Sequence, residues 1–298
     1  MKMKHPTKKT VSLVLGSGGA RGYAHIGVIE VLEEQGYQIR SVSGSSMGAL
    51  IGGLYACGKL EAYKEWVLTL DIFSLLKLVD FSFASTGVIQ GDKVFDVLER
   101  IVGKNIRIEE LPIDYTAVAT DINTQKEVWF REGDLLEAIR ASIAIPTVFT
   151  PKINEKQLLV DGGILNPLPT VPLLSDSNDL LIAVNLNGES RVVKKLQERS
   201  REEETLQEKI AAFIQDNIIP QRDENEVNYF TIFSKTIETM QNLITRYELA
   251  AHQPDILMEI PKNLCGFYEF HEARKIIDYG RDVALKALKE HEALEKLS

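Results

Sequence analysis

A serine in the stretch SVSGSSMGAL has the spacing of a nucleophile elbow. Ser46 lies two residues after Gly44 and two residues before Gly48. In an elbow, a sharp turn from strand to helix exposes the serine hydroxyl, and glycines allow that turn without side-chain collisions. The helix N-terminus behind Ser46 would also favour negative charge that develops beside it. An ordinary serine in a strand–helix turn is the alternative, because three fixed positions make a weak pattern.

A second glycine-rich segment, GSGGARG at residues 16–22, also lies between a predicted strand and a predicted helix. Backbone N–H groups in such a loop can bind a phosphate, a dinucleotide or the oxyanion of an acyl-transfer reaction. A phosphate loop requires lysine and then serine or threonine after its last glycine, but Gly22 is followed by tyrosine and alanine. A dinucleotide fingerprint requires glycine or alanine where Arg21 stands, and it requires an acidic residue at the end of the second strand, where this chain has Ser41, Val42 and Ser43. A dinucleotide site is therefore not favoured. The oxyanion interpretation remains, with the amides of Gly18 and Gly19 as donors.

A serine nucleophile needs a base, and no histidine of the chain has a convincing context for that role. The histidines are His5, His25, His252, His271 and His291. His25 lies on the apolar face of the first predicted helix, which favours a core position. A carboxylate fits better: in LLVDGGILNPLP, Asp161 follows a predicted buried strand and reaches the carboxyl edge of the sheet. A turn aspartate that bonds its own backbone at Gly163 is the alternative.

Alternating strands and helices surround these motifs. Apolar runs predict strands at 11–15 and 38–43, and apolar periodicity predicts helices at 20–34 and 47–56. This order is typical of parallel strands between helices, so we expect a three-layer α/β/α fold with a mostly parallel central sheet. Further predicted strands occupy 115–119, 127–130, 157–160, 180–186 and 256–260, and further predicted helices occupy 135–141, 227–251 and 268–294.

Composition limits the classes of partner and the cellular location that we expect for the chain. Its 298 residues carry a net charge of -9, which argues against a nucleic-acid partner. Two widely separated cysteines, Cys57 and Cys265, match neither a disulfide framework nor a zinc site and suit a reducing cytoplasm. No apolar run is long enough to span a bilayer, and the basic start of the chain lacks the apolar region of a secretory signal. We therefore expect a cytoplasmic protein.

Together, the motifs resemble those of the patatin-like phospholipase family. GSGGARG at 16–22, GSSMG at 44–48 and DGG at 161–163 stand in the family's order, and the blocks ATDINTQK and SIAIPTVFTP add lesser similarity. The resemblance covers residues 11–186, and short bacterial members related to the catalytic domain of neuropathy target esterase look most similar. Ser17 departs from the pattern, because many relatives have glycine there, and it is tolerable if its φ is negative.

The resemblance implies a catalytic dyad, with Ser46 as nucleophile and Asp161 as proton acceptor, and it requires no histidine, metal or cofactor. Arg21 matches the family's arginine, which has a structural or charge-stabilising role. The implied oxyanion hole and glycine loop comprise Gly16, Gly18, Gly19, Ala20, Arg21 and Gly22. The elbow glycines would be Gly44 and Gly48, and the DGG motif would add Gly162 and Gly163.

The implied reaction is hydrolysis of a fatty-acyl ester of a lipid through an acyl-serine, which water activated by Asp161 then cleaves. An acyltransferase would use the same acyl-serine and pass it to an alcohol or thiol. A non-catalytic lipid-binding or regulatory protein would keep the motifs without turnover. The sequence leaves these alternatives open, and it specifies neither the lipid head group nor the oligomeric state.

We expect three regions along the chain: a basic tail at 1–10, a patatin-like catalytic domain at 11–190, and a mainly helical C-terminal extension at 191–298 that packs on it. Residues 60–103 are a candidate helical cap. The apolar stretch that begins at Trp66 and ends near residue 83 suits an acyl-binding wall or a peripheral membrane contact, and core packing is its alternative. The charged, glycine-free composition of 191–226 predicts an exposed helix or a solvated insertion.

Overall fold

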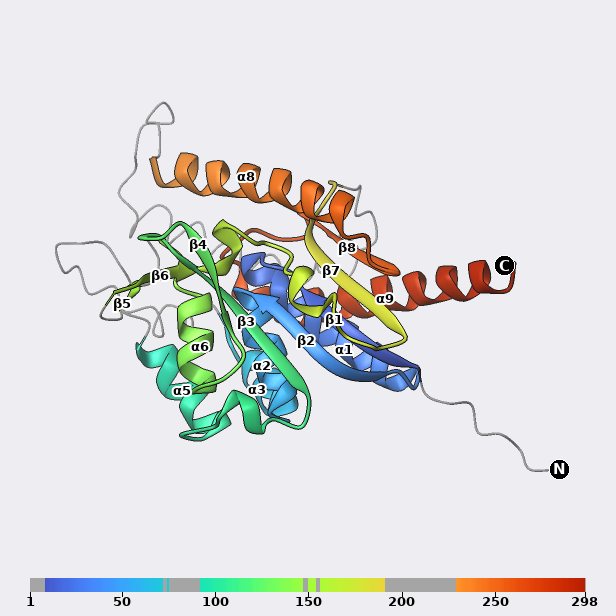
Figure 1. Cartoon of the computed structure of the whole chain (residues 1–298), viewed down its shortest axis with the longest axis horizontal. Coiled ribbons are helices and arrows are strands. Elements are labelled where there is room, and N and C mark those ends of the chain that lie inside the picture. Colours follow the sequence, from blue (N-terminus) through green and yellow to red (C-terminus); the bar gives the residue numbers. More distant parts are fainter. Residues whose placement is uncertain are drawn as a thin grey trace.

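The computed structural model describes residues 9–71, 74, 92–146, 150–153, 156–190 and 229–297. The charged segment at 191–226 and most of the predicted acyl-binding wall, at 72–73 and 75–83, therefore lie outside the described residues. Within the described part of the chain, eight strands form one sheet (Figure 1). These strands are β1 Thr10–Leu15, β2 Gln38–Ser45, β3 Asp114–Asp121, β4 Lys126–Phe130, β5 Lys152–Ile153, β6 Leu158–Asp161, β7 Leu180–Gly188 and β8 Ile256–Pro261.

The sheet is mostly parallel. Its order is β5-β6-β3-β2-β1-β7-β8, with β4 also paired to β3. The pairs β3–β2, β2–β1, β1–β7 and β7–β8 are parallel. The pairs β3–β4, β3–β6 and β5–β6 are antiparallel. The nearly continuous apolar sequence of β1, VSLVL, suits a strand that is covered on both faces.

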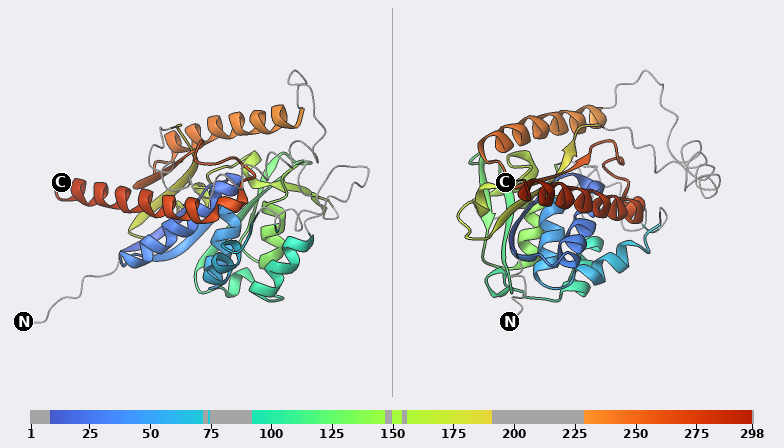
Figure 2. Two further views of the ribbon diagram at one scale, coloured as in Figure 1. Left: turned by 180° about the vertical axis from the view of Figure 1, so that it is seen from behind. Right: turned by 90° about the vertical axis from the view of Figure 1, so that its right-hand side faces the viewer.

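Helices cover both faces of this sheet, as the sequence predicted. Leu13 and Leu15 of β1 belong to the large core cluster, whereas Val14 between them packs with Leu168 and Leu249 on the opposite face. The helices are α1 Ala24–Glu34, α2 Met47–Ala56, α3 Leu60–Val67, α5 Asp92–Val102, α6 Leu135–Ser142, α8 Tyr229–Ala251 and α9 Ala273–Glu295. α8 lies across one side of the sheet, and α1, α2, α6 and α9 lie on the other (Figure 1 and Figure 2).

The first predicted helix differs from the prediction in two ways. Residues 20–34 divide between a 3₁₀ turn, η1 Gly19–Tyr23, and α1. The prediction of a single apolar face is too narrow, because α1 is buried on nearly every side between the sheet and α9. Glycines permit this close helix crossing: a Cβ on Gly27 would lie 2.1 Å from the Ile277 carbonyl oxygen, and one on Gly280 would lie 2.1 Å from that of Ala24.

The chain beyond residue 229 contributes to both the sheet and the core. β8 pairs in parallel with β7, and α9 packs against α1 and β8. Ile256, Met258 and Ile276 belong to the same large core cluster as Leu13. The two sides of residue 190 therefore share one core, and a domain boundary there stays a prediction.

The described parts of the candidate cap are α3 and α5. Tyr63, Val67 and Leu98 are buried in the large core cluster, and Trp66 and Leu70 pack against it. These residues therefore pack in the core, which was the alternative to an acyl-binding wall or a membrane contact. None of the helices described is both long enough and apolar enough to cross a membrane.

Candidate active site

The register of β3 brings the serine and aspartate motifs together. β2 pairs with β3 as far as Ser45, opposite Val118, and β6 pairs with β3 from Asp161, opposite the next residue, Ala119. Because β4 occupies the other edge of β3, β2 and β6 meet end to end along one edge. Ser46 follows β2 directly and therefore lies beside Asp161, although 115 residues separate them in the sequence.

Ser46 forms the turn between β2 and α2. Its backbone has φ 56° and ψ -124°, a conformation that residues with a side chain rarely adopt. Its amide donates to Ser142 Oγ at 3.0 Å, and that hydroxyl donates to the Val118 carbonyl at 2.6 Å, so the turn is anchored to α6 and β3. A Cβ on Gly44 would lie 2.3 Å from the carbonyl carbon of Gly48. The strained serine and the glycine contact are the local geometry of a nucleophile elbow.

Gly48 gives the first testable prediction. An added Cβ at this position would lie 2.0 Å from the Leu15 carbonyl oxygen, and neither backbone segment can move without disturbing the sheet. We expect Gly48→Ala to lower the free energy of unfolding by about 3 kcal/mol, measured by urea unfolding. Gly266→Ala is the control, because its Cβ would meet the flexible side chain of Glu269 at 3.1 Å. Equal losses in the two variants would contradict the prediction.

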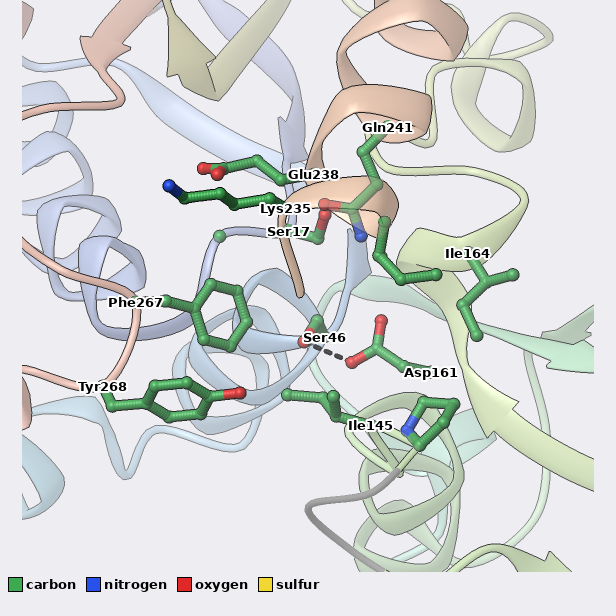
Figure 3. A pocket seen from close by; sticks show the side chains of 13 residues that line it. Ser17, Ser46, Ile145, Asp161, Ile164, Lys235, Glu238, Gln241, Phe267 and Tyr268 are labelled. Carbon is green, nitrogen blue, oxygen red and sulfur yellow. Dashed lines mark hydrogen bonds between the residues drawn. The ribbon is translucent and has the colours of Figure 1, made fainter. Parts of the chain in front are cut away.

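The side chains of Ser46 and Asp161 are hydrogen-bonded to each other in a buried position. Ser46 Oγ donates to Asp161 Oδ2 at 2.5 Å (Figure 3), and the Gly163 amide donates to Asp161 Oδ1 at 2.7 Å. Asp161 therefore fits both alternatives at once: Oδ1 makes the bond of a turn aspartate, and Oδ2 makes the bond to Ser46. Burial raises the pKa of Asp161 to about 7, against the opposing effects of the hydrogen bonds from Ser46 and Gly163.

The glycine loop borders the pocket that contains this pair, through Ser17 and Gly18. The amides of Gly16, Ser17 and Ala20 donate to the carbonyls of Val184, Pro167 and Phe267. Within the described part of the chain, the amides of Gly18 and Gly19 have no such acceptor. Ser17 is absent from the residues with positive φ, so the condition for serine at this position is met. Gly18 lines the same pocket as Ser46, which suits the predicted use of these amides.

Arg21 fixes the orientation of this loop from behind. Its buried guanidinium donates from Nε to the Gly18 carbonyl at 3.2 Å, from Nη1 to the Lys262 carbonyl at 3.0 Å and from Nη2 to Glu238 Oε1 at 3.0 Å. In a trans peptide the C=O and N–H groups point in opposite directions, so the bond to the Gly18 carbonyl turns the Gly19 amide away from Arg21. This geometry favours the structural role over direct contact of the arginine with a substrate.

His25 is a structural histidine. It is fully buried, and its Nε2 donates to the Gly16 carbonyl at 2.8 Å. Burial lowers the pKa of His25 to about 4, so the ring is neutral near pH 7. His252, His271 and His291 do not line the pocket around Ser46, and His5 lies outside the described residues.

A pocket of about 320 Å³ opens above Ser46 and Asp161 (Figure 3). Apolar groups form most of its wall, and three of the polar side chains come from α8. The lining residues are Ser17, Gly18, Ser46, Ile145, Pro146, Asp161, Ile164, Lys235, Ile237, Glu238, Gln241, Phe267 and Tyr268. The described residues hold no cluster of histidine, cysteine and carboxylate side chains that could bind a metal ion.

Sequence reasoning missed the part of the pocket that the C-terminal half supplies. Lys235, Ile237, Glu238 and Gln241 come from α8, and Phe267 and Tyr268 come from the loop before α9. The residues described in the predicted cap, by contrast, do not line this pocket. Nothing in the local pattern of α8 distinguishes a helix that closes a pocket from one that only covers a sheet.

Comparisons with known proteins identify a matching family and several similar proteins. The model of the patatin-like phospholipase family matches residues 13–174. An uncharacterized NTE family protein of Mycobacterium bovis is 38% identical over 342 residues, which cover 98% of this chain and 95% of that protein. Patatin-like phospholipase domain-containing protein 6 of Mus musculus is 32% identical over 191 residues, which cover 61% of this chain and 14% of that protein.

Among solved structures, VipD from Legionella pneumophila matches 97% of this chain and 68% of its own, with a TM-score of 0.47 and 15% identity. The sheet, the two motifs on its edge and the family match define a class of lipid ester hydrolases. The chain belongs to the patatin-like phospholipase family. The resemblance found in the sequence is thereby confirmed.

Proposed function

We propose that this chain is a serine acyl hydrolase that cleaves fatty-acyl esters of lipids, with Ser46 as nucleophile and Asp161 as its base. The hydrogen bond of 2.5 Å from Ser46 Oγ to Asp161 Oδ2, inside a largely apolar pocket, carries this proposal. Membership of the family supports a lipid ester as substrate. A cytoplasmic location with peripheral membrane contact completes the proposal, and the free thiols of Cys57 and Cys265 suit it.

The proposed reaction has two steps. Ser46 Oγ attacks the ester carbonyl carbon while its proton moves to Asp161 Oδ2. The tetrahedral intermediate then collapses, and the departing alcohol oxygen takes the proton from Asp161. In the second step water attacks the acyl-serine, and Asp161 accepts the proton of that water. Collapse returns the proton to Ser46 Oγ and releases the fatty acid, so one ester and one water give one alcohol and one acid.

The glycine loop would stabilise the oxyanion of both steps. The amides of Gly18 and Gly19 are donors without a protein acceptor in the described residues, and the N-terminus of α2 lies behind Ser46. A preorganised donor of this kind contributes about 3 kcal/mol to stabilisation of the transition state. The bond from Arg21 to the Gly18 carbonyl keeps the loop in this orientation before the substrate arrives.

The proposal is tested by labelling and product analysis on the purified chain. A fluorophosphonate probe should modify Ser46, identified by mass spectrometry of the labelled peptide, and a panel of lipid esters should release free fatty acid. Added lysolipid or coenzyme A competes with water for the acyl-serine, so acylated acceptor in excess of free acid would indicate a transferase. Absence of labelling at Ser46 would favour the non-catalytic alternative.

The pH dependence follows from the protonation state of Asp161. A base must be ionised to accept a proton, and burial raises the pKa of this carboxyl to about 7. We therefore expect kcat/KM for a neutral ester to rise with pH and to level off above about pH 8. The measurement is a rate profile with an uncharged soluble ester, which keeps substrate ionisation out of the result. A rate that is constant from about pH 5 to about pH 9 would contradict this role.

A further inference from the structure

The outer face of α8 carries exposed apolar side chains. Ile232, Met240, Leu243 and Tyr247 have exposed fractions of 51%, 51%, 45% and 69%. At about 100° per residue, these four side chains lie within roughly 80° of arc around the helix. In Figure 1 and Figure 2, α8 lies at the periphery of the molecule, so this face of the helix points away from the sheet.

Threonines fill the gaps between these side chains without adding free hydroxyls. Thr236 Oγ1 donates to the Ile232 carbonyl at 2.9 Å, and Thr239 Oγ1 donates to the Lys235 carbonyl at 2.7 Å. Because both hydroxyls bond to the helix backbone, these side chains present mainly their methyl groups. The surface that these six side chains form is therefore mainly apolar. We define the α8 stripe as Ile232, Thr236, Thr239, Met240, Leu243 and Tyr247.

The opposite face of α8 closes the pocket that contains Ser46. Gln241 is about 180° around the helix from Ile232, and it is buried. Lys235, Glu238 and Gln241 line the pocket in Figure 3, and Ile237 lines it as well. A surface that bound the α8 stripe would therefore lie one helix diameter, about 10 Å, from the pocket wall.

The acidic and basic side chains of α8 lie on different parts of the helix surface. Its two acidic side chains do not lie free on the outer face: Glu238 pairs with Arg21, and Glu248 is partly buried. Arg246 is exposed on the outer face, and Lys235 is exposed at the border between this face and the pocket, whose wall it also lines. Neither forms an ion pair with the described part of the chain. Both lie within about 60° of Ile232 around the helix. The outer face thus carries only positive charge, on a protein with a net charge of -9.

We infer that the α8 stripe docks the protein on a lipid surface that contains anionic head groups. The apolar side chains enter the interfacial region, and Lys235 and Arg246 lie at the level of the head groups. The inference rests on the proposed function, since a lipid substrate is presented in such a surface. The exposed charge on this face of α8 is positive, whereas the whole protein carries a net charge of -9, so an anionic surface is favoured over a second copy of the chain.

The test is flotation of the full chain with vesicles of phosphatidylcholine and phosphatidylglycerol, which measures binding without catalysis. We expect M240E/L243E to lower the affinity for these vesicles by about tenfold or more, because two charges replace two inserted apolar side chains. The matched control is L285E/L294E, which makes the same change at exposed leucines of α9 and should bind as the wild type does. Hydrolysis of a soluble short-chain ester should stay unchanged in both double variants.

The outcomes separate docking from catalysis. A wild type that does not float, or equal flotation of the two double variants, overturns the docking surface and leaves the serine hydrolase intact. A wild-type dimer in solution that M240E/L243E dissociates also overturns it, because a second copy then covers the stripe. Tyr247→Trp is a milder variant in case the double variant fails to fold. Its fluorescence should shift to shorter wavelength with these vesicles, and no shift would contradict insertion.

Discussion

Replacing Ser46 with alanine should lower kcat/KM for fatty-acyl esters by about 10⁴-fold or more. The described pocket offers no other hydroxyl hydrogen-bonded to Asp161, so the variant can act only through water placed by the remaining groups. The amides of Gly18 and Gly19 would still polarise a bound carbonyl, which is why a small residual rate is compatible with the mechanism. Covalent labelling by a fluorophosphonate should disappear together with hydrolysis.

Ser43→Ala is the matched control for Ser46→Ala. Ser43 is also a buried serine of the β2 segment, but its hydroxyl donates to the Pro169 carbonyl at 2.5 Å rather than to Asp161. Loss of that bond should cost about 1 to 2 kcal/mol of stability and leave the rate per folded molecule nearly unchanged. Equal losses of activity in the two variants would show that packing of β2, not the Ser46 hydroxyl, limits the rate. Persistent labelling of Ser46→Ala would place the nucleophile elsewhere.

The sequence predicted the elements around the motifs because their signals are local. The apolar run that stops at Gly16 predicted β1, and the apolar sequence after Ser46 predicted α2, each to within a residue of its observed ends. The prediction for β2 ended too early, at residue 43, because Gly44 and Ser45 are poor strand formers. They are held in the strand by pairing with Ala117 and Val118 of β3, which no local pattern of β2 contains.

The residues of the candidate site also differ in whether a local sequence signal marks them. Ser46 and Asp161 belong to motifs whose residue types already limit their chemistry, so they could be singled out from the sequence. Their contact depends on the shared edge of β3. Gln241 and Phe267 could not be found in this way, because they reach the pocket through the packing of distant segments. Phe267 even holds the glycine loop, through the bond from the Ala20 amide to its carbonyl.

Asp161→Asn should remove hydrolysis and at the same time stabilise the fold at pH 8. The folded-state pKa of Asp161 is about 7, above its ordinary value of 3.8, because burial disfavours the carboxylate. Between these two values the folded state binds more protons than the unfolded state, so the stability contributed by the protonated form falls as pH rises. The carboxylate therefore costs about 4 kcal/mol of stability above pH 7.

An asparagine carries no charge to desolvate, and its oxygen can still accept from the Gly163 amide. We expect urea unfolding at pH 8 to give a free energy of unfolding a few kcal/mol higher for Asp161→Asn than for the wild type. This difference should shrink as the pH approaches about 4, where the wild-type carboxyl is also neutral. Activity should be lost at every pH, because the amide cannot accept the proton of Ser46.

Asp121→Asn, on the neighbouring β3, should have the opposite sign. Hydrogen bonds from Thr124 and from the amides of Leu158 and Asn123 lower the pKa of Asp121, so its carboxylate stabilises the fold above its ordinary pKa. The variant should therefore unfold more easily than the wild type at pH 8 and keep its activity per folded molecule. If both variants were destabilised at pH 8, ionisation of Asp161 would not destabilise the folded state. Asp161 would then lack the raised pKa on which its proposed role as a base near neutral pH depends.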